Sequence, residues 1–197
     1  MNMQQTLKIA IFASGNGTNA ENIIRYFQSH GEYGMEVALV VANNPEAYVL
    51  QRARSLNVPA KTVPAKGFRD PEVILPLLDE FGVSAIVLAG FLLMVPEFII
   101  DRYQNRILNI HPSLLPKFGG KGMYGHHVHE AVVAAGEKET GITIHRVTAD
   151  CDKGEIVFQT TVDLTPDDTP QTIEAKIHVL EQRYFPEVIA KTFCNLG

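Results

Sequence analysis

The sequence has few cysteines, no long apolar run and no excess of positive charge. Its two cysteines, Cys151 and Cys194, form no close-spaced metal or redox motif, so a reduced, cytoplasmic protein is expected. No stretch approaches the roughly 20 apolar residues of a membrane helix, and no basic segment followed by an apolar run marks a signal peptide. The formal net charge of −5 argues against binding along a nucleic-acid backbone. A local basic pocket for one small phosphate is still compatible with this charge.

Apolar residues are plentiful, because 46% of the chain is hydrophobic and only 20% is charged. This composition predicts one globular domain over residues 1–197. Strands and helices alternate in the first part of the chain, with strands expected at 7–14, 35–44, 84–91 and 106–111 and helices at 19–30, 48–57, 71–82 and 96–103. Such alternation predicts a doubly wound, mostly parallel, Rossmann-like α/β sheet. After a helix at 127–135, two consecutive strands within about 140–164 add an antiparallel edge, and a helix at 170–192 closes the chain.

A glycine-rich turn, "SGNGTN" at 14–19, follows the first expected strand. Thr18 and Glu21 fit a capping box, which would leave free N–H groups at a helix N-terminus, where a phosphate binds favourably. The turn lacks the third glycine of a dinucleotide fingerprint, and no Gly-Lys-Ser/Thr follows as in a P-loop. The pattern alone leaves two interpretations open, a site for a phosphate monoester or a turn that only reverses the chain.

Two polar residues share one face of an otherwise apolar strand in "LNIHPSLLP" at 108–116. Asn109 and His111 are two residues apart, so both side chains point the same way. An Asn amide can donate to a developing oxyanion, and a His can move a proton near neutral pH. The alternative is a structural pair that satisfies neighbouring backbone groups. Asp150 and Asp152 follow in "TADCDKGEIV", and a carboxylate from this turn would orient His111 if the fold brings them together.

Other residues favour structural roles when they are read alone. His126 and His129 have a spacing suited to a metal, but no third ligand stands at a fixed offset, so no metal is expected. The apolar side chains of Phe91, Leu92 and Met94 are expected first in the core. His178 and Glu181 share one face of the expected last helix, and a solvent-exposed polar face is the simple explanation of this pair.

Four segments in a fixed order carry a resemblance to a known family: "ASGNGTN", "LAGF", "NIHPSLLPKF" and "GITIHRVTADCDKGEIVFQ". From about residue 8 to about residue 192, the chain resembles the glycinamide ribonucleotide formyltransferases, which are folate-dependent enzymes of de novo purine biosynthesis. The resemblance implies transfer of the formyl group of 10-formyltetrahydrofolate, as co-substrate, to the amine of glycinamide ribonucleotide. It implies catalytic roles for Asn109, His111 and Asp152, and no metal.

The resemblance also implies where the two substrates bind. It places the substrate phosphate on the glycine-rich turn and the ribose hydroxyls on Glu181. It also places His178 beside the phosphate, at a position where some members have Gln. The turn residues expected at the phosphate are Gly15, Asn16, Gly17, Thr18 and Asn19. The residues expected at the folate are Arg69, Phe91, Leu92, Leu93, Met94, Val95, Thr148, Ala149, Asp150 and Cys151. The loop within 119–132 is longer than in many relatives, Leu93 replaces an Arg of some relatives, and Arg69 is a loose match, which leaves the folate tail without a clear contact.

Related activities remain as alternatives. Methionyl-tRNA formyltransferase would need an added C-terminal domain and a basic surface. Formyltetrahydrofolate hydrolase would need a regulatory domain ahead of the first strand, which is expected near residue 7. A non-catalytic phosphate-binding module would share the fold without the chemistry, and the chain could act as a monomer or as a homodimer.

Overall fold

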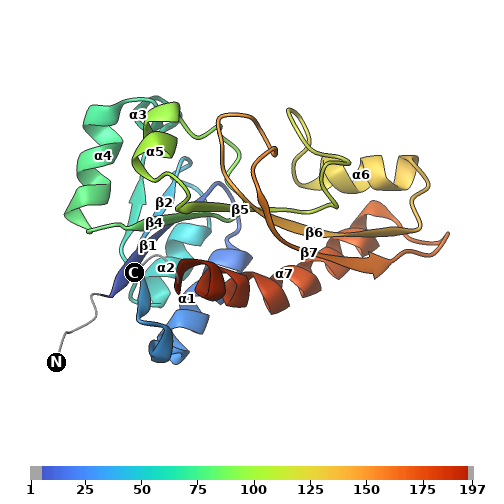
Figure 1. Ribbon diagram of the computed structural model, residues 1–197, viewed down its shortest axis with the longest axis horizontal. Helices are drawn as coiled ribbons and strands as arrows, with labels where there is room; N and C mark the ends of the chain where they lie inside the picture. The colour runs from blue at the N-terminus through green and yellow to red at the C-terminus, as the bar shows by residue number, and fades with distance from the viewer. Residues whose placement is uncertain (1–5, 195–197) are drawn as a thin grey trace.

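The computed structural model describes residues 6–194, so the segment before residue 6, which contributes to the signal-peptide expectation, lies outside the described residues. Its strands form one seven-stranded sheet in the order β3-β2-β1-β4-β5-β6-β7 (Figure 1). The strands are β1 (Leu7–Ala13), β2 (Met35–Ala42), β3 (Ala60–Thr62), β4 (Ala85–Leu88), β5 (Ile107–His111), β6 (Glu139–Arg146) and β7 (Ile156–Asp163). The first five pair in parallel, whereas β5, β6 and β7 pair antiparallel. The predicted fold class, with its antiparallel edge, is confirmed.

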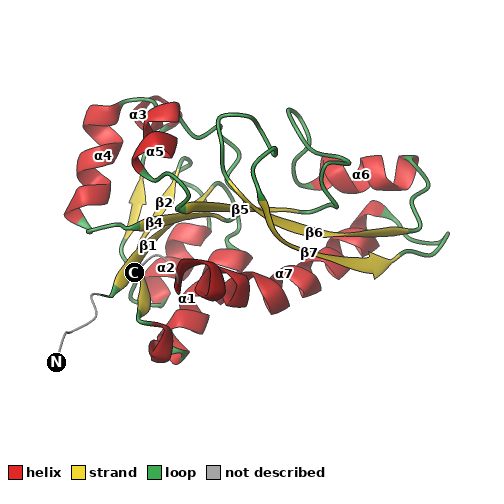
Figure 2. Ribbon diagram, in the orientation of Figure 1, coloured by secondary structure: helices red, strands yellow, loops and turns green. Residues whose placement is uncertain are grey.

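Helices cover both faces of this sheet (Figure 2). They are α1 (Thr18–Ser29), α2 (Val49–Ser55), α3 (Ala65–Phe68), α4 (Pro71–Glu80), α5 (Glu97–Arg102), α6 (His126–Ala134) and α7 (Pro170–Phe193), and a 3-10 helix, η1, spans Gly31–Tyr33. Along β1, Ile9 and Ile11 pack with α1, α2 and α7, whereas Ala10 and Phe12 pack with α3, α4 and α5. A strand buried on both faces is apolar at every position, which is why the central strands are nearly continuous apolar runs.

Three short elements and one helix start differ from the sequence-based expectation. The three-residue strand β3, the four-residue helix α3 and the 3-10 helix η1 were not predicted, because segments this short carry no periodicity. The prediction of a capping box at the start of α1 is wrong. Gly17, with φ of 80°, occupies the N-cap, no side chain caps the helix, and Glu21 pairs instead with Arg25 and Arg52.

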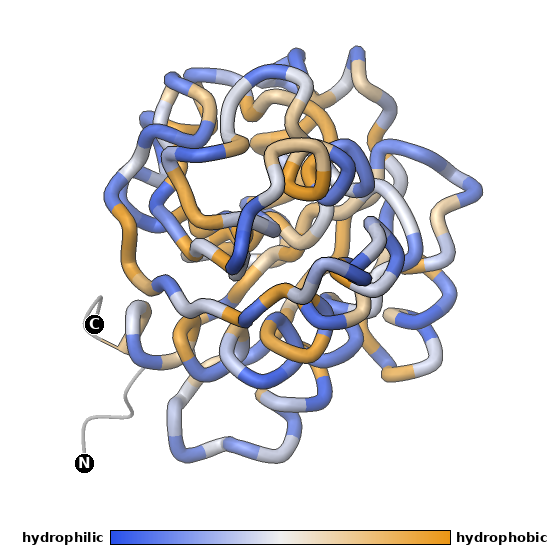
Figure 3. Tube along the Cα trace, turned by 90° about the vertical axis from the view of Figure 1, so that its right-hand side faces the viewer, coloured by the Kyte–Doolittle hydropathy of each residue, from blue (hydrophilic) through white to orange (hydrophobic). Residues whose placement is uncertain are grey.

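The apolar segments gather in the middle of the molecule, and hydrophilic segments form most of the outer turns (Figure 3). No helix within residues 6–194 is both long enough and apolar enough to cross a membrane. Strand β1 lies between β2 and β4, so the order of the chain reverses at this point of the sheet. In open α/β sheets, ligands bind beyond the carboxyl ends of the strands at such a reversal.

Candidate active site

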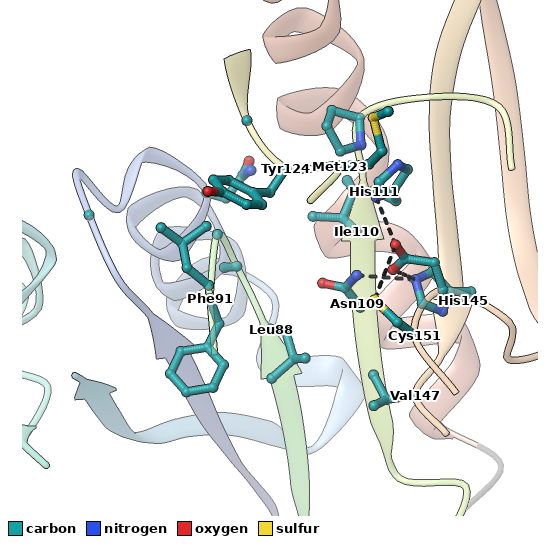
Figure 4. Close-up of a pocket in the computed structure, with 18 of the residues that line it drawn as sticks. Leu88, Phe91, Asn109, Ile110, His111, Met123, Tyr124, His145, Val147 and Cys151 are labelled. Carbon is teal, nitrogen blue, oxygen red and sulfur yellow. Dashed lines mark hydrogen bonds and ion pairs between the residues drawn. The ribbon is translucent and has the colours of Figure 1, made fainter. Parts of the chain in front are cut away.

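A cavity of about 580 Å³ opens beyond the carboxyl ends of β1, β4 and β5. Five segments contribute to its lining: the glycine-rich turn at 15–19, residues 88–95 from the end of β4 onward, residues 109–112 at the end of β5, the loop 120–125, and residues within 145–152 from the end of β6 into the β6–β7 turn. Helix α7 adds Glu174, Ile177, His178 and Glu181. Figure 4 shows Asn109, His111 and His145 gathered on one side of this cavity, across from Leu88 and Phe91. The cavity therefore combines polar groups with an apolar wall, as small-molecule sites do.

His111 stands at the end of β5 and is held by two groups from different loops. Its Nε2 lies 2.8 Å from the carbonyl oxygen of Phe118, and its Nδ1 lies 3.7 Å from Oδ2 of Asp152. Because a carbonyl oxygen can only accept, Nε2 carries a proton and donates it to Phe118. In the neutral ring, Nδ1 is then an unprotonated nitrogen facing a carboxylate, which is the atom placed to take up a proton.

Burial lowers the pKa of His111 below its usual value, and the attraction of Asp152 and the carbonyl of Phe118 offset this only in part. The side chain is only 4% exposed, so the charged form loses most of its hydration. The imidazole is consequently neutral near pH 7. The approach of Nδ1 to Asp152 becomes an ion pair only after the ring takes up a proton.

Asp152 joins three parts of the site. Its Oδ2 accepts a 2.9 Å hydrogen bond from the backbone N–H of Gly120, and its Oδ1 lies 3.5 Å from Nε2 of His145. Burial acts to raise the pKa of Asp152, but the contact with His145, the hydrogen bond from Gly120 and the nearby His111 outweigh it and lower the pKa to about 2. The carboxylate therefore stays ionised beside a histidine that is neutral.

His145 is the functional residue that the sequence did not single out. It lies on β6, directly opposite Asn109 of β5, and its ring is buried. Its Nδ1 donates to the carbonyl oxygen of Arg146 at 2.9 Å, and Asn109 Nδ2 lies 3.1 Å from its Nε2. In the neutral ring Nε2 accepts one hydrogen of the Asn109 amide, so the second hydrogen remains for a ligand.

Two of the four non-glycine residues with positive φ in the described part of the chain lie at this site. Phe118 and Asp152 have φ of 53° and 55°, in the left-handed region that residues other than glycine rarely adopt. One supplies the carbonyl oxygen that holds His111, and the other supplies the carboxylate that faces it. Strained backbone is common at functional sites, where the surrounding fold fixes it.

The opposite end of the cavity is built from the glycine-rich turn and α7. Asn19 Nδ2 donates to Glu181 Oε2 at 2.9 Å, and His178 Nδ1 lies 3.0 Å from the same oxygen. The hydrogen bond to Glu181 raises the pKa of His178, although burial acts to lower it. Glu181 is buried despite its charge, so a solvated polar face does not describe it. The N-terminus of α1 and a histidine that favours its charged form make this end suited to an anion.

Comparison with known proteins agrees with this geometry. The formyl transferase family model matches residues 7–189. The chain belongs to the formyl transferase family. It is 35% identical over 186 residues to the phosphoribosylglycinamide formyltransferase of Bacillus subtilis, which covers 92% of both chains. It is 37% identical to the chloroplastic phosphoribosylglycinamide formyltransferase of Arabidopsis thaliana, of whose length it spans 64%. The solved phosphoribosylglycinamide formyltransferase of Bacillus halodurans superimposes with a TM-score of 0.85 at 36% identity, covering 96% of this chain and 97% of that one.

The fold of this formyl transferase brings most of the sequence-predicted site residues to one cavity. The three residues expected to be catalytic, the whole glycine-rich turn, His178 and Glu181 all line it. So do most of the expected folate residues, namely Phe91, Leu92, Leu93, Met94, Val95, Thr148, Asp150 and Cys151. Arg69 and Ala149 are not among the lining residues, so the structure gives no support to a contact between Arg69 and the folate tail.

The expectation that Leu92 and Met94 belong to the core is wrong. Leu92 is 58% exposed and Met94 is 62% exposed, because both project from the turn after β4 and line the open cavity. The main chain of this turn is fixed to the glycine-rich turn, since Leu92 N–H donates to Ser14 Oγ at 2.9 Å. This formyl transferase thus keeps an apolar surface exposed beside the polar cluster of Asn109, His111, His145 and Asp152.

Within residues 6–194, no group of three or more His, Cys, Asp or Glu is arranged to hold a metal ion.

Proposed function

We propose that this chain transfers the formyl group of 10-formyltetrahydrofolate to the amine of glycinamide ribonucleotide in purine biosynthesis. The observation that carries the proposal is that one cavity holds an anion-binding turn, an exposed apolar wall, and Asn109 with His111 and Asp152. The turn suits the phosphate of the ribonucleotide, and the apolar wall suits the flat pterin. The names of the relatives point to the same acceptor.

The ribonucleotide end is assigned to the glycine-rich turn with α7. Backbone N–H groups of Gly15, Asn16, Gly17, Thr18 and Asn19 hold the phosphate at the start of α1, and His178 adds a positive charge. Glu181, fixed by Asn19, accepts hydrogen bonds from the ribose hydroxyls. The pterin lies against residues 91–95 and the backbone of residues 148–151, which places it beside the polar cluster.

The chemistry follows from the protonation states of the cluster. The amine attacks the formyl carbon, and the carbonyl electrons move onto its oxygen, where the free hydrogen of the Asn109 amide stabilises them. His111 accepts the proton lost by the amine at Nδ1, and Asp152 stabilises the imidazolium. When the tetrahedral intermediate collapses, the bond from carbon to N10 of the folate breaks, and His111 returns its proton to N10. The products are formylglycinamide ribonucleotide and tetrahydrofolate.

Two other activities would use the same fold. In a hydrolase, water would replace the amine, and the ribonucleotide would not be required for loss of the formyl group. In a non-catalytic module, both ligands would bind without turnover. The anion-binding turn favours the phosphorylated acceptor, because a hydrolase has no use for it. Monomer or homodimer assembly and a cytoplasmic location stay predictions.

The deciding experiment measures absorbance as a 10-formyl folate loses its formyl group, with and without glycinamide ribonucleotide. The proposal expects turnover that requires the ribonucleotide and is lost in His111→Ala, while His127→Ala, an exposed histidine on α6, keeps it. Loss of the formyl group without the ribonucleotide would indicate hydrolysis. Binding of both ligands by the wild type without turnover would favour the non-catalytic module.

A further inference from the structure

Arg52 lies outside the lining of the cavity, yet its guanidinium is bonded to the glycine-rich turn. Nε donates to the carbonyl oxygen of Asn16 at 2.9 Å, and Nη2 donates to Oδ1 of the same residue at 3.0 Å. Nη1 forms an ion pair with Glu21 in the first turn of α1. The guanidinium carbon also lies 4.8 Å from the centre of the Tyr48 ring. All three nitrogens of this one cation are therefore engaged, two of them with Asn16 of the turn.

The rest of helix α2 supports the turn at neighbouring points. Val49 N–H donates to the carbonyl oxygen of Gly15 at 3.1 Å. The side chain of Val49 packs so closely on Gly17 that a Cβ there would come within 2.8 Å of Val49 Cα. The backbone of residues 15–17 thus accepts one hydrogen bond from Val49 and one from Arg52, the side chain of Asn16 accepts a second from Arg52, and Val49 limits the space at Gly17. Only Arg52 among these contacts acts through a charged side chain.

We infer that Arg52 is a positioning residue for the phosphate of the acceptor substrate, acting through Asn16; the inference rests on the proposed function. A turn with two glycines has many backbone conformations when it is free, and ordering it upon binding costs affinity. The hydrogen bonds from Arg52 to Asn16 come from the side of the turn away from the cavity. They hold the N–H groups of the turn in the anion-binding conformation before the anion binds. An exposed ion pair alone contributes only about 0–1 kcal/mol, but here two hydrogen bonds go to one residue of the turn.

The test compares Arg52→Met, which keeps the apolar part of the stem, with Arg54→Met as a matched control, because Arg54 is an exposed arginine on the same helix. Arg52→Met is expected to raise KM for the ribonucleotide about tenfold, with KM for the folate and kcat within about twofold of wild type. Arg52→Lys should recover only part of the loss, since an ammonium cannot reproduce the planar fork of donors. Equal increases in both KM values would overturn the proposal by indicating general damage.

A double-variant comparison tests whether Arg52 acts through Asn16. The Asn16→Ala and Arg52→Met changes are expected to raise KM for the ribonucleotide together by less than the product of their separate effects. Increases that multiply fully would overturn the proposed route through the Asn16 side chain, because Arg52 would then act independently of Oδ1.

Inorganic phosphate separates failure of this inference from failure of the proposed function. Millimolar phosphate should raise the Tm of wild type and of Arg54→Met, and raise the Tm of Arg52→Met less or not at all. This reading holds even if the wild type shows no turnover with glycinamide ribonucleotide, in which case only the proposed function fails. Equal Tm increases in all three proteins, or none in the wild type, would overturn the role of Arg52.

Discussion

Asp152 faces His111 on one side of the cavity, with 3.7 Å between Oδ2 and Nδ1, although the two residues belong to the β6–β7 turn and to the end of β5. The other nitrogen of the ring is already bonded to Phe118. The geometry therefore leaves one nitrogen for proton transfer and places a permanent negative charge beside it. The ring can take up a proton in the reaction because the carboxylate is ionised before the reaction begins.

Replacing Asp152 with Asn removes this charge while keeping the size of the side chain. The Asp152→Asn variant is expected to lose kcat by a factor on the order of 10² or more, because the imidazolium loses its partner. KM for both substrates should change by only a few fold. Steady-state kinetics on Asp152→Asn and on Asp101→Asn, an exposed acid on α5, would check this. Equal losses of binding and rate would contradict a catalytic role for Asp152.

The lowered pKa of His111 predicts how the rate depends on pH. Only the neutral ring can accept a proton, so kcat should fall as pH drops through a value below the ordinary pKa of histidine and should be level between that value and pH 8. Asp152, with a pKa of about 2, stays ionised over this whole range and adds no second step. A kcat–pH profile would check this, and the acidic limb should vanish from the residual activity of His111→Asn but persist in His127→Asn. A limb above pH 7 would contradict the burial argument.

The sequence predicted those parts of the site that depend on local pattern. Asn109 and His111 could be placed on one face because strand period alone decides it, and the glycine-rich turn could be placed at a strand end. The central strands were predictable from their apolar runs. The capping box was not, because Gly17 takes the N-cap in a conformation that a Cβ would oppose, which frees Glu21 to pair with Arg25 and Arg52.

The unpredicted parts depend on contacts between distant segments. His145 lies opposite Asn109 only because β5 and β6 pair in one particular antiparallel register. No local sequence pattern predicts that register. The meeting of His111 with Asp152 needs the β6–β7 turn and the loop after β5 to fold over the same strand end. Arg52 gives no sign of its role in "LQRARS", because its partners lie in a different turn.

His145 is expected to hold Asn109 and Asp152 in their working positions. His145→Phe keeps a ring of similar size but removes both polar contacts, leaving the Asn109 amide free to turn and raising the pKa of Asp152. We expect kcat to fall at least about tenfold with smaller changes in KM. Combined with Asp152→Asn, the loss should be less than the product of the single losses, because both changes break one network. Fully multiplicative losses in steady-state kinetics would show that His145 works separately.

Gly17 should tolerate no side chain, for two separate reasons. Its φ of 80° is unfavourable for L-residues, and a Cβ would overlap the Val49 side chain. Gly17→Ala is therefore expected to lower the free energy of unfolding by about 1–3 kcal/mol and to raise KM for the ribonucleotide on the order of tenfold, because the start of α1 must shift. Gly31→Ala, where a Cβ would meet open space, is the control and should change neither quantity measurably.

Shortening the opposing side chain relieves part of the overlap. Val49→Ala in the Gly17→Ala background removes the Cγ2 methyl that the new Cβ would meet at 2.4 Å, but leaves φ and the close approach of Val49 Cβ and Cα unchanged. Denaturant unfolding and KM should therefore recover only in part. Full recovery would show that overlap with the Cγ2 methyl of Val49 alone excludes alanine. A Gly17→Ala protein with the stability and KM of the wild type would mean that the turn adapts freely, and that its backbone is not held in advance for the phosphate.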